Sequence, residues 1–390
     1  MTNSVIILCF VPYYLPGYRS GGPVRTIANF VDHLGDEFDI RIVTRDRDAL
    51  DTMPYPYVRV DEWNTVGKAR VFYASDRALS LLRVASLLRR TPHDLLYLNS
   101  FFSVRFTTLP LLARRLGLAP SKPCVIAPRG EFSEGAFALK GWKKQPYATL
   151  SRQIGLYRGL HWQASSGFEA ADIRRVAAVP MTAITVAPNL PSAITPSLNQ
   201  AVSRKRGPLR LIFLSRISPK KNLDYLLRIL QKVKIDIHLD IYGTIDDYTY
   251  ERKCNAIIQS MPDNVCIAYL GGIPHEQVAQ TMAQYHLFVL PTLGENYGHA
   301  IAEAISQGTP VLISDQTPWR DLEVHNAGWD ISLSEPERFL KIIERVNNMD
   351  EQAYLSLRDS TVAYAKERLR DQGIIQVNRE FMMSMLGLVG

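Results

Sequence analysis

Short apolar runs alternate with segments of helical periodicity through the first half of the chain. Residues 5–11 form a continuous apolar run that predicts a buried strand, and a loop over 12–23 separates it from an amphipathic helix expected over 24–34. Further strands are expected at 40–44, 95–98, 124–127, 161–164 and 183–187, and Ser166 with Glu169 has the spacing of a helix start. This alternation is typical of a doubly wound parallel sheet, which binds ligands at the carboxyl ends of its strands.

The pattern is interrupted over residues 191–207, where Pro, Ser, Asn and a basic cluster (Arg204, Lys205, Arg206) replace the apolar runs, as in a linker. Strands are expected again at 209–214, 237–242, 265–270, 288–290 and 311–313, and the chain after 331 has a helical pattern nearly to its end. We therefore predict two α/β domains with Rossmann-like, doubly wound parallel sheets, at 1–190 and 208–367, followed by a terminal helix at about 368–390.

The stretch 288–314 places two carboxylates around a strand, a loop, a helix and a second strand. Glu295 is expected in the loop and Glu303 about two turns along a helix that runs from about 297 to 307 and stops at Gly308. N–H groups at a helix N-terminus bind phosphate, and a carboxylate can take both hydroxyls of a ribose. The stretch therefore suits a nucleotide-sugar. The alternative is an ordinary αβ unit with a solvent-facing loop Glu.

Arg216 and Lys221 follow the first strand of the second domain, in a loop that leads into a helix. Two cations at this strand end, close to the expected position of Glu295, would neutralise a leaving diphosphate, as a magnesium ion does in other transferases. A solvated loop that serves as the helix entry is the alternative.

A glycine-containing loop with Gly17, Gly21 and Gly22 lies between the first strand and the first helix. Its spacing is not G-x-G-x-x-G, and no acidic residue ends the second strand, which counts against a nicotinamide cofactor. The adjacent Gly21 and Gly22 still allow close backbone approach to an anion such as the diphosphate of a donor. A plain strand-to-helix turn is the alternative.

A basic loop follows the strand at 124–127. It begins with Pro128-Arg129-Gly130-Glu131 and continues to Lys140, Trp142, Lys143 and Lys144. Aromatic rings between lysines are typical of a membrane edge or of a phosphate-lined acceptor mouth. No recognisable nucleic-acid module is present. A solvated loop is the alternative.

The charge of the chain is unevenly distributed. Residues 1–200 carry 24 Lys and Arg against 15 Asp and Glu, whereas the remainder carries 21 against 23, so the net charge of +7 belongs to the first half. A basic first domain suggests an anionic partner, with a lipid phosphate, an anionic membrane face and nucleic acid as candidates. A merely solvated surface is the alternative. The hydrophobic content of 46% and charged content of 21% indicate a globular chain.

The sequence predicts no metal site and no membrane span. Four dispersed cysteines lack zinc-site spacing and are expected to be buried free thiols in a reducing cytosol. Asp46-Arg47-Asp48 has an Asp-x-Asp spacing but is expected on the surface, and the histidines show no i, i+4 pairing. The apolar run at 5–11 is too short to cross a bilayer and lacks the flanks of a signal peptide.

These motifs, taken in order, resemble the retaining glycosyltransferases of family 4, which have the GT-B fold. The resemblance lies in Arg216 and Lys221, in Gly271-Gly272 before a helix, and in the Glu295-x7-Glu303 element with Asn296-Tyr297-Gly298 inside it. Gly21-Gly22 is similar to the family's first-domain loop and Pro188-Asn189 to its interdomain segment. The resemblance implies two Rossmann-like domains that face a cleft, with C-terminal helices crossing back to the first domain.

The resemblance also implies residue roles. Arg216 and Lys221 would hold the donor diphosphate and act in catalysis together with Glu295, which would contact the transferred sugar. The segment Asn296, Tyr297 and Gly298 would meet the sugar or the phosphates through its N–H groups, and Glu303 would bind the ribose. Many relatives carry a His where this chain has Arg129, so acceptor contacts by Arg129 and Glu131 are the least defined part.

We therefore expect a metal-independent, cofactor-free glycosyltransferase that retains anomeric configuration. It would move a sugar from a nucleotide-diphosphate sugar to a hydroxyl of a glycan or lipid-diphosphate-linked glycan, in bacterial surface polysaccharide synthesis. We expect a cytoplasmic protein with peripheral contact to the inner face of the plasma membrane and no nucleic-acid partner. The alternatives are a GT-B sugar-nucleotide epimerase, a phosphorylase with lysine-bound pyridoxal phosphate, and a non-catalytic nucleotide-sugar-binding protein.

Overall fold

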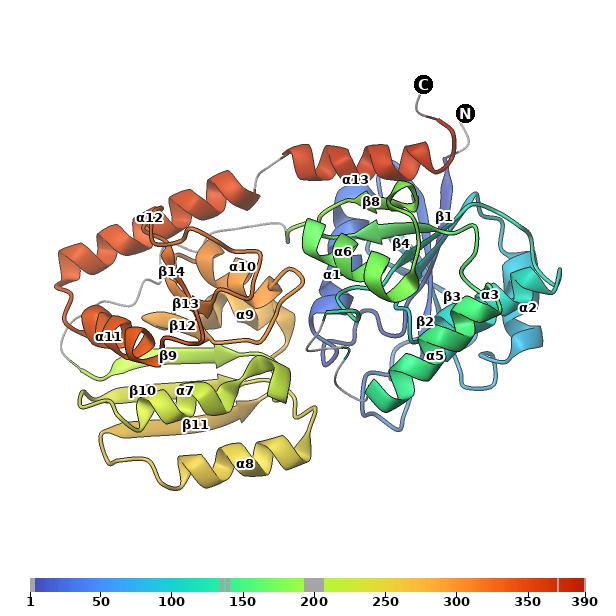
Figure 1. The fold of residues 1–390 in the computed structure, drawn as a ribbon. Coiled ribbons are helices and arrows are strands. Elements are labelled where there is room, and N and C mark those ends of the chain that lie inside the picture. The colour runs from blue at the N-terminus through green and yellow to red at the C-terminus, as the bar shows by residue number, and fades with distance from the viewer. Residues whose placement is uncertain (1–3, 134–136, 138–140, 193–206, 370–371, 389–390) are drawn as a thin grey trace. The chain divides into compact units, whose positions relative to one another are not determined.

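The computed structural model describes residues 4–133, 137, 141–192, 207–369 and 372–388. The chain divides into two compact units (Figure 1). Unit 1 comprises Met1–Leu190 together with Gln372–Gly390, and unit 2 comprises Pro191–Asp371. Most of the expected linker, together with Lys140, lies outside the described residues.

Unit 1 is built on an eight-stranded sheet with the strand order β3-β4-β2-β1-β5-β6-β7-β8. Its strands are β1 (Ile6–Phe10), β2 (Asp39–Arg45), β3 (Trp63–Val66), β4 (Ala69–Ala74), β5 (Leu95–Asn99), β6 (Cys124–Ala127), β7 (His161–Ala164) and β8 (Ile184–Val186). The helices are α1 (Gly22–Leu34), α2 (Leu81–Arg90), α3 (Leu109–Arg115), α5 (Gly141–Gln153), α6 (Gly167–Ala177) and α13 (Gln372–Ser384), with short helical turns η1 (Val104–Thr108) and η2 (Met181–Ala183).

One edge of this sheet differs from the wholly parallel sheet that was predicted. β3 pairs with β4 in an antiparallel hairpin, and β4 pairs with β2 in parallel. Gly67 in the connecting turn has φ 56, the left-handed conformation that tight hairpins need. The Trp63–Val66 strand is short, polar in the middle and only half-buried, so it carries no apolar run from which it could be predicted.

The central strands of unit 1 are buried on both faces, and their side chains alternate between two cores. Ile7 and Cys9 of β1 belong to one cluster, and Leu8 and Phe10 belong to the other. Helix α13 contributes Phe381 and Met382 to the first of these clusters. The end of the chain therefore returns to the first unit, as was expected.

Unit 2 is built on a six-stranded parallel sheet with the order β11-β10-β9-β12-β13-β14. Its strands are β9 (Leu209–Leu214), β10 (Ile237–Tyr242), β11 (Val265–Gly271), β12 (Leu287–Leu290), β13 (Val311–Ser314) and β14 (Gly328–Ile331). The helices are α7 (Leu223–Leu230), α8 (Tyr248–Ile258), α9 (His275–Met282), α10 (His299–Ser306), α11 (Pro336–Asn347) and α12 (Glu351–Leu369), with a 3-10 turn η4 (Pro219–Lys221).

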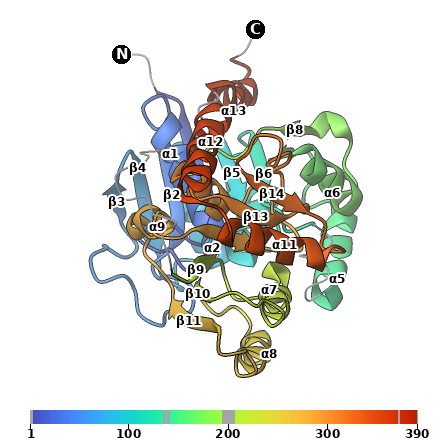
Figure 2. The same ribbon diagram turned by 90° about the vertical axis from the view of Figure 1, so that its left-hand side faces the viewer.

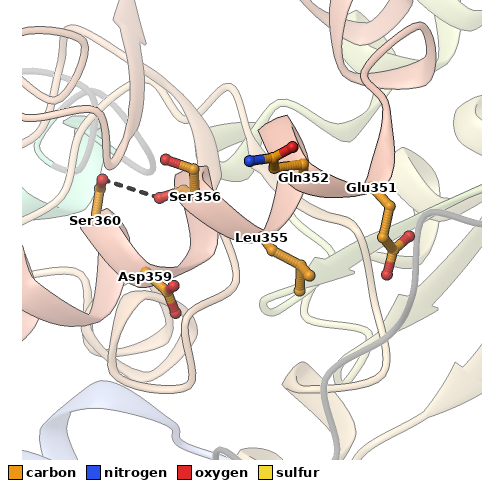
Figure 3. Close-up of a pocket in the computed structure, with 6 residues that line it drawn as sticks. All are labelled: Glu351, Gln352, Leu355, Ser356, Asp359 and Ser360. Atoms are coloured by element: carbon orange, nitrogen blue, oxygen red, sulfur yellow. Dashed lines mark hydrogen bonds between the residues drawn. The ribbon is translucent and has the colours of Figure 1, made fainter.

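Two local features complete unit 2. β14 was not predicted, since its four residues include the polar Asp330; its Gly328 is required because a Cβ there would lie 2.2 Å from the Val311 carbonyl oxygen of β13. Helices α7 and α8 lie next to each other, to the right of β10 and β11 in Figure 2, and the Tyr250 hydroxyl, on α8, donates a hydrogen bond to Asp224, on α7.

The cysteines match their expected state only in part. All four are free, and Cys9, Cys124 and Cys254 are buried. Cys266, on the edge strand β11, is exposed, so the prediction of burial is wrong for that thiol. Edge strands present alternate side chains to solvent, which a short apolar run does not reveal.

Candidate functional site

The loop between β12 and α10 contains Glu295, Asn296, Tyr297 and Gly298. We call this loop the α10 mouth. Gly298 has φ 82, and a Cβ there would meet the Ile301 side chain at 2.8 Å, so α10 begins at His299, two residues later than expected. The Trp319 indole donates a hydrogen bond of 2.6 Å to the carbonyl oxygen of Tyr297. The loop is therefore held in place from the side by a largely buried ring.

Lys221 and Glu295, predicted from two separate motifs, form an ion pair. The Lys221 ammonium donates to the Glu295 carboxylate, and the two side chains are only 12% and 11% exposed. Their loops follow β9 and β12, which are neighbouring parallel strands. Two further bonds tie these loops together, because Leu293 N donates to Lys220 O at 2.8 Å and the Asn222 amide donates to Pro291 O at 2.9 Å.

Arg216 occupies the same strand end but faces a different partner. Its guanidinium donates at 2.8 Å to Asp246, on the loop after β10, and its side chain is 42% exposed. A surface pair of this kind is weak and easily rearranged. Arg216 is thus a second cation at the carboxyl edge, and it pairs with Asp246 whereas Lys221 pairs with Glu295.

Glu303 lies on α10 and faces the first turn of α9. Its carboxylate is 3.4 Å from Nδ1 of His275, and its side chain is 14% exposed. Burial raises the pKa of the nearby Tyr297 hydroxyl, and the charge of Glu303 raises it further. Glu303 therefore lies close to the α10 mouth on a largely enclosed face.

The glycine loop of unit 1 is held by a carboxylate that was predicted to be on the surface. Asp48 accepts hydrogen bonds from Tyr18 N at 2.8 Å and Arg19 N at 3.1 Å, and it is buried, as is Asp46. The surface assignment is therefore wrong for both residues. The reason is that backbone N–H groups thirty residues away satisfy Asp48, whereas Asp46 is bound by the adjacent Arg47 guanidinium.

Gly21 and Gly22 follow this held segment. Gly21 caps α1 with φ 63, and Gly22 is the first helical residue, followed by Pro23. No side chain caps the helix, and α1 has no acidic residue in its first turn. Gly21 N donates to Tyr18 O and Val24 N donates to Gly21 O, and Pro23 has no N–H, so what the start of α1 offers an anion is close approach past two residues without side chains.

Arg129 lies directly after β6 in a left-handed conformation, φ 56. Its guanidinium donates to Asn99 Oδ1 at 3.0 and 2.8 Å, to Asn189 Oδ1 at 2.7 Å and to the Tyr97 hydroxyl. Non-glycine residues in this conformation cluster at functional sites. Arg129 therefore joins two neighbouring strand ends to the last residues of unit 1 before the linker.

Glu131 binds the loop after β5. Its carboxylate accepts from Ser100 Oγ at 2.7 Å, Phe101 N at 2.5 Å and Phe102 N at 3.2 Å. Burial raises its pKa, while these hydrogen bonds and the charge of Lys144 oppose the rise. Glu131 thus fixes the loop after β5 against the loop that contains Arg129.

Sequence reasoning missed four of the polar partners in these sites. They are Asp48, Asn99, Asp246 and His275. Each stands at or just beyond the carboxyl end of a strand, or at the start of the helix that follows. That position is the signal by which they could have been found. Within the described residues, no group of three or more His, Cys, Asp or Glu is arranged to hold a metal ion.

Comparison with known families defines the class of protein. Residues 196–368 match the family model "Glycosyl transferases group 1", which spans nearly all of unit 2 and somewhat under half of the chain. Unit 2 is therefore a glycosyl transferases group 1 domain. The Lys221–Glu295 pair lies inside this domain, so the comparison defines the class of the domain that carries the candidate site.

Solved structures give the fold. The chain is similar to HepE of Anabaena, solved with UDP and glucose (TM-score 0.70, 17% identity, 97% of this chain and 100% of that one). It is also similar to the sucrose-phosphate synthase of Thermosynechococcus elongatus (0.70, 14%, 98% and 100%). WaaG, a glycosyltransferase involved in lipopolysaccharide biosynthesis, gives 0.64 at 13% identity over 98% and 99%. The fold is thus GT-B.

A curated relative matches over a shorter region. The GtfA subunit of the UDP-N-acetylglucosamine–peptide N-acetylglucosaminyltransferase of Streptococcus pneumoniae is 26% identical over 113 residues, which are 28% of this chain and 21% of that protein. The match thus spans about a fifth of the relative. Among the described residues, none of the helices has both the length and the apolar composition needed to span a membrane.

Proposed function

We propose that this glycosyltransferase moves a sugar from a nucleotide-diphosphate sugar to a hydroxyl of a glycan, with retention of anomeric configuration and without a metal. The observation that carries the proposal is the Lys221–Glu295 pair at the mouth of α10, inside a glycosyl transferases group 1 domain. It places a cation and a carboxylate side by side in the loops that follow β9 and β12, the second of which leads into α10. These groups suit a donor that is anionic at its diphosphate and hydroxylated at its sugar.

The donor would be held by groups with separate tasks. Lys221 and Arg216 would bind the diphosphate and stabilise the charge that develops on it as the glycosidic bond breaks. Glu295 would bind hydroxyls of the transferred sugar, while the N–H groups of Asn296, Tyr297 and Gly298 meet the sugar or phosphate oxygens. Glu303 would accept hydrogen bonds from the ribose hydroxyls, and Gly21 and Gly22 of unit 1 would allow close approach of the diphosphate.

A uridine-diphosphate sugar is the first donor to test. HepE was solved with UDP-glucose, and the name of the GtfA complex specifies UDP-N-acetylglucosamine. We extend that base to this chain as part of the proposal.

The acceptor would meet unit 1 near Arg129 and Glu131. Arg129 supplies a cation held by three neutral groups, and Glu131 fixes the neighbouring loop. The name of WaaG refers to lipopolysaccharide biosynthesis, and unit 1 is basic, which together favour a growing glycan or a lipid-diphosphate-linked glycan in bacterial surface polysaccharide synthesis. The enzyme would work in the cytoplasm, in peripheral contact with the inner face of the plasma membrane.

A thermal-shift panel of UDP-, GDP- and ADP-sugars, with and without EDTA, tests the proposal. A ligand present at 100 times its dissociation constant stabilises the fold by about 2.7 kcal/mol, which gives an easily measured shift. We expect one nucleotide class to stabilise the protein equally with EDTA present. No shift with any nucleotide would contradict the donor site, and a shift abolished by EDTA would contradict metal independence.

Product analysis separates this function from the rival activities. Proton NMR of the product should show the anomeric configuration of the donor, and UDP should be released in step with transfer. Inversion would contradict the retaining mechanism. UDP exchange that does not depend on pyrophosphate would indicate an epimerase, and phosphate-dependent sugar release would indicate a phosphorylase. Binding without turnover would indicate a non-catalytic protein.

A further inference from the structure

Helix α5 carries apolar side chains on the side that unit 1 does not cover. Ala148 and Ser151 are its buried residues, whereas Trp142 is 75% exposed and Leu150 is 59% exposed. Ile154, just beyond the helix, is 58% exposed, and Pro146 is also exposed. We call Trp142, Pro146, Leu150 and Ile154 the α5 face. They are spaced four residues apart, so they follow one side of the helix.

The first half of the α5 face lies opposite the side by which the helix packs, and Leu150 lies at its flank. At 100° per residue, Ala148 and Ser151 fall on one side of the helix and Trp142 and Pro146 on the other. Figure 1 shows α5 lying lengthwise on the outside of unit 1. A solvent-facing helix normally carries polar residues there, so exposed Trp and Leu at this spacing call for a partner.

The charges around the α5 face identify the chemistry of that partner. No Asp or Glu occurs in residues 135–168, which include five Lys and Arg. Lys143, Arg152 and Arg158 are exposed, and the ammonium of Lys143 lies 4.6 Å from the centroid of the Trp142 ring. An apolar stripe whose own segment carries cations and no carboxylate complements a surface that is anionic outside and apolar beneath.

The end of α3 is hydrogen-bonded to the turn that follows α5. The Arg115 guanidinium, at the end of α3, donates to the carbonyl oxygens of Gly155 and Arg158. Leu116, the next residue in the chain, is 61% exposed. The turn after α5 is thus joined to the end of α3, and the residue that follows α3 is also apolar and exposed.

We propose that the α5 face docks unit 1 onto an anionic bilayer, with Trp142, Leu150 and Ile154 in the headgroup region and the flanking cations at the lipid phosphates. The inference specifies the membrane contact of the proposed function and rests on it, because a lipid-linked acceptor would be presented at that surface. Trp prefers the interface, where its ring is partly apolar and its N–H stays hydrated. Protein–protein interfaces deplete Lys at their centre, whereas here Lys143 lies over the ring itself.

Co-sedimentation of the full chain with vesicles tests the proposal. We expect binding to phosphatidylcholine vesicles that contain phosphatidylglycerol, weaker binding to pure phosphatidylcholine, and reversal by salt, since screening shortens the reach of surface charges. The double variant Leu150→Ser/Ile154→Ser should bind at least about tenfold more weakly, because burying one such side chain is worth about that factor. Val324→Ser, 81% exposed on unit 2, is the matched control and should bind like the wild type.

Two further measurements make the result specific to the α5 face. Brominated lipids should quench part of the tryptophan fluorescence of the wild type, and Trp142→Phe should remove that part. Lys143→Gln/Arg152→Gln should weaken binding at low salt, whereas Lys366→Gln, an exposed control on α12, should not.

Three results would overturn the proposal. They are absence of vesicle binding at low salt, equal binding by the Ser variant and its control, and a wild-type dimer in sedimentation equilibrium that the Ser variant converts to monomer. Thermal shifts with UDP-sugars are measured on the same samples. If the wild type shows UDP-sugar shifts but does not bind vesicles, only the proposed docking surface is contradicted. If the wild type shows no UDP-sugar shifts, the proposed function is contradicted.

Discussion

Lys221 donates a hydrogen bond to the carboxylate of Glu295, so that the ends of two neighbouring parallel strands, β9 and β12, are joined by a nearly buried ion pair. Each charge is costly to bury without its partner. A donor diphosphate that attracts Lys221 and a sugar that binds Glu295 would both have to compete with, or share, this pair. A change in either residue should therefore affect its partner, but Lys221 should act mainly on the diphosphate and Glu295 mainly on the sugar.

The first prediction concerns Glu295. Glu295→Gln removes the charge but keeps the shape, so Lys221 remains available to the phosphates. We expect turnover to fall by about 100-fold or more while the dissociation constant for the UDP-sugar changes by less than about tenfold, as for a group whose contact strengthens in the transition state. Steady-state kinetics and calorimetric titration provide the two numbers. Equal changes in both would show that Glu295 acts in uniform binding only.

The second prediction concerns Glu303 and the ribose. Glu303→Ala should weaken UDP binding by roughly 1–3 kcal/mol, the usual effect of losing a charge-assisted hydrogen bond. The same variant should lose the preference for UDP over its 2′,3′-dideoxy analogue, because the hydroxyls would no longer find the carboxylate. Titration of both nucleotides into both proteins closes a double-mutant cycle. A variant that still discriminates between them would place the ribose elsewhere.

The third prediction concerns Asp48 and the glycine loop. Asp48→Asn keeps the volume but weakens the acceptor for Tyr18 N and Arg19 N, so we expect a loss of about 1–3 kcal/mol in the free energy of unfolding. Asp51→Asn is the control, because Asp51 forms an exposed ion pair with Arg19, worth at most about 1 kcal/mol. Urea titrations measure both. If the two variants lose the same stability, Asp48 does not hold the loop.

The fourth prediction concerns pH and Glu131. Burial raises the pKa of Glu131 above its ordinary 4.5, so the folded state binds a proton that the unfolded state releases. The stabilising contribution is then fully present below pH 4.5 and is lost as the pH rises through the higher folded value. The stability of the wild type relative to Glu131→Gln should therefore fall as the pH rises through this window. Urea unfolding at a series of pH values checks this, and a difference that stays constant or grows with pH would reverse the sign.

The sequence predicts the main strands because apolar runs such as residues 7–10 and 209–214 are buried on both faces of a sheet. It also predicts that α6 starts after Ser166, whose hydroxyl accepts from Glu169 N. The Glu169 carboxylate, however, binds Gly130 N and Ser165 rather than closing a capping box. Local spacing thus defines the helix start but not the contact of the side chain with a distant loop.

For the candidate site, too, the sequence predicts the positions of residues at strand ends but not their distant partners. Lys221 and Glu295 were expected to be close because their strands end at one edge of one sheet. The ion pair of Arg216 with Asp246 and the burial of Asp48 were not, because each depends on a partner about thirty residues away. Nothing in the local pattern marks such pairs.

Calorimetric titration of UDP into the wild type, Lys221→Ala and Lys232→Ala tests the central claim most directly, namely that the Lys221–Glu295 pair marks the donor site. Lys232 forms an exposed ion pair with Glu337 and serves as the matched control. We predict that Lys221→Ala weakens binding by about 10- to 100-fold, the effect of losing a charge-assisted contact to phosphate, while Lys232→Ala binds like the wild type. Equal affinity of Lys221→Ala and the wild type for UDP would contradict the account.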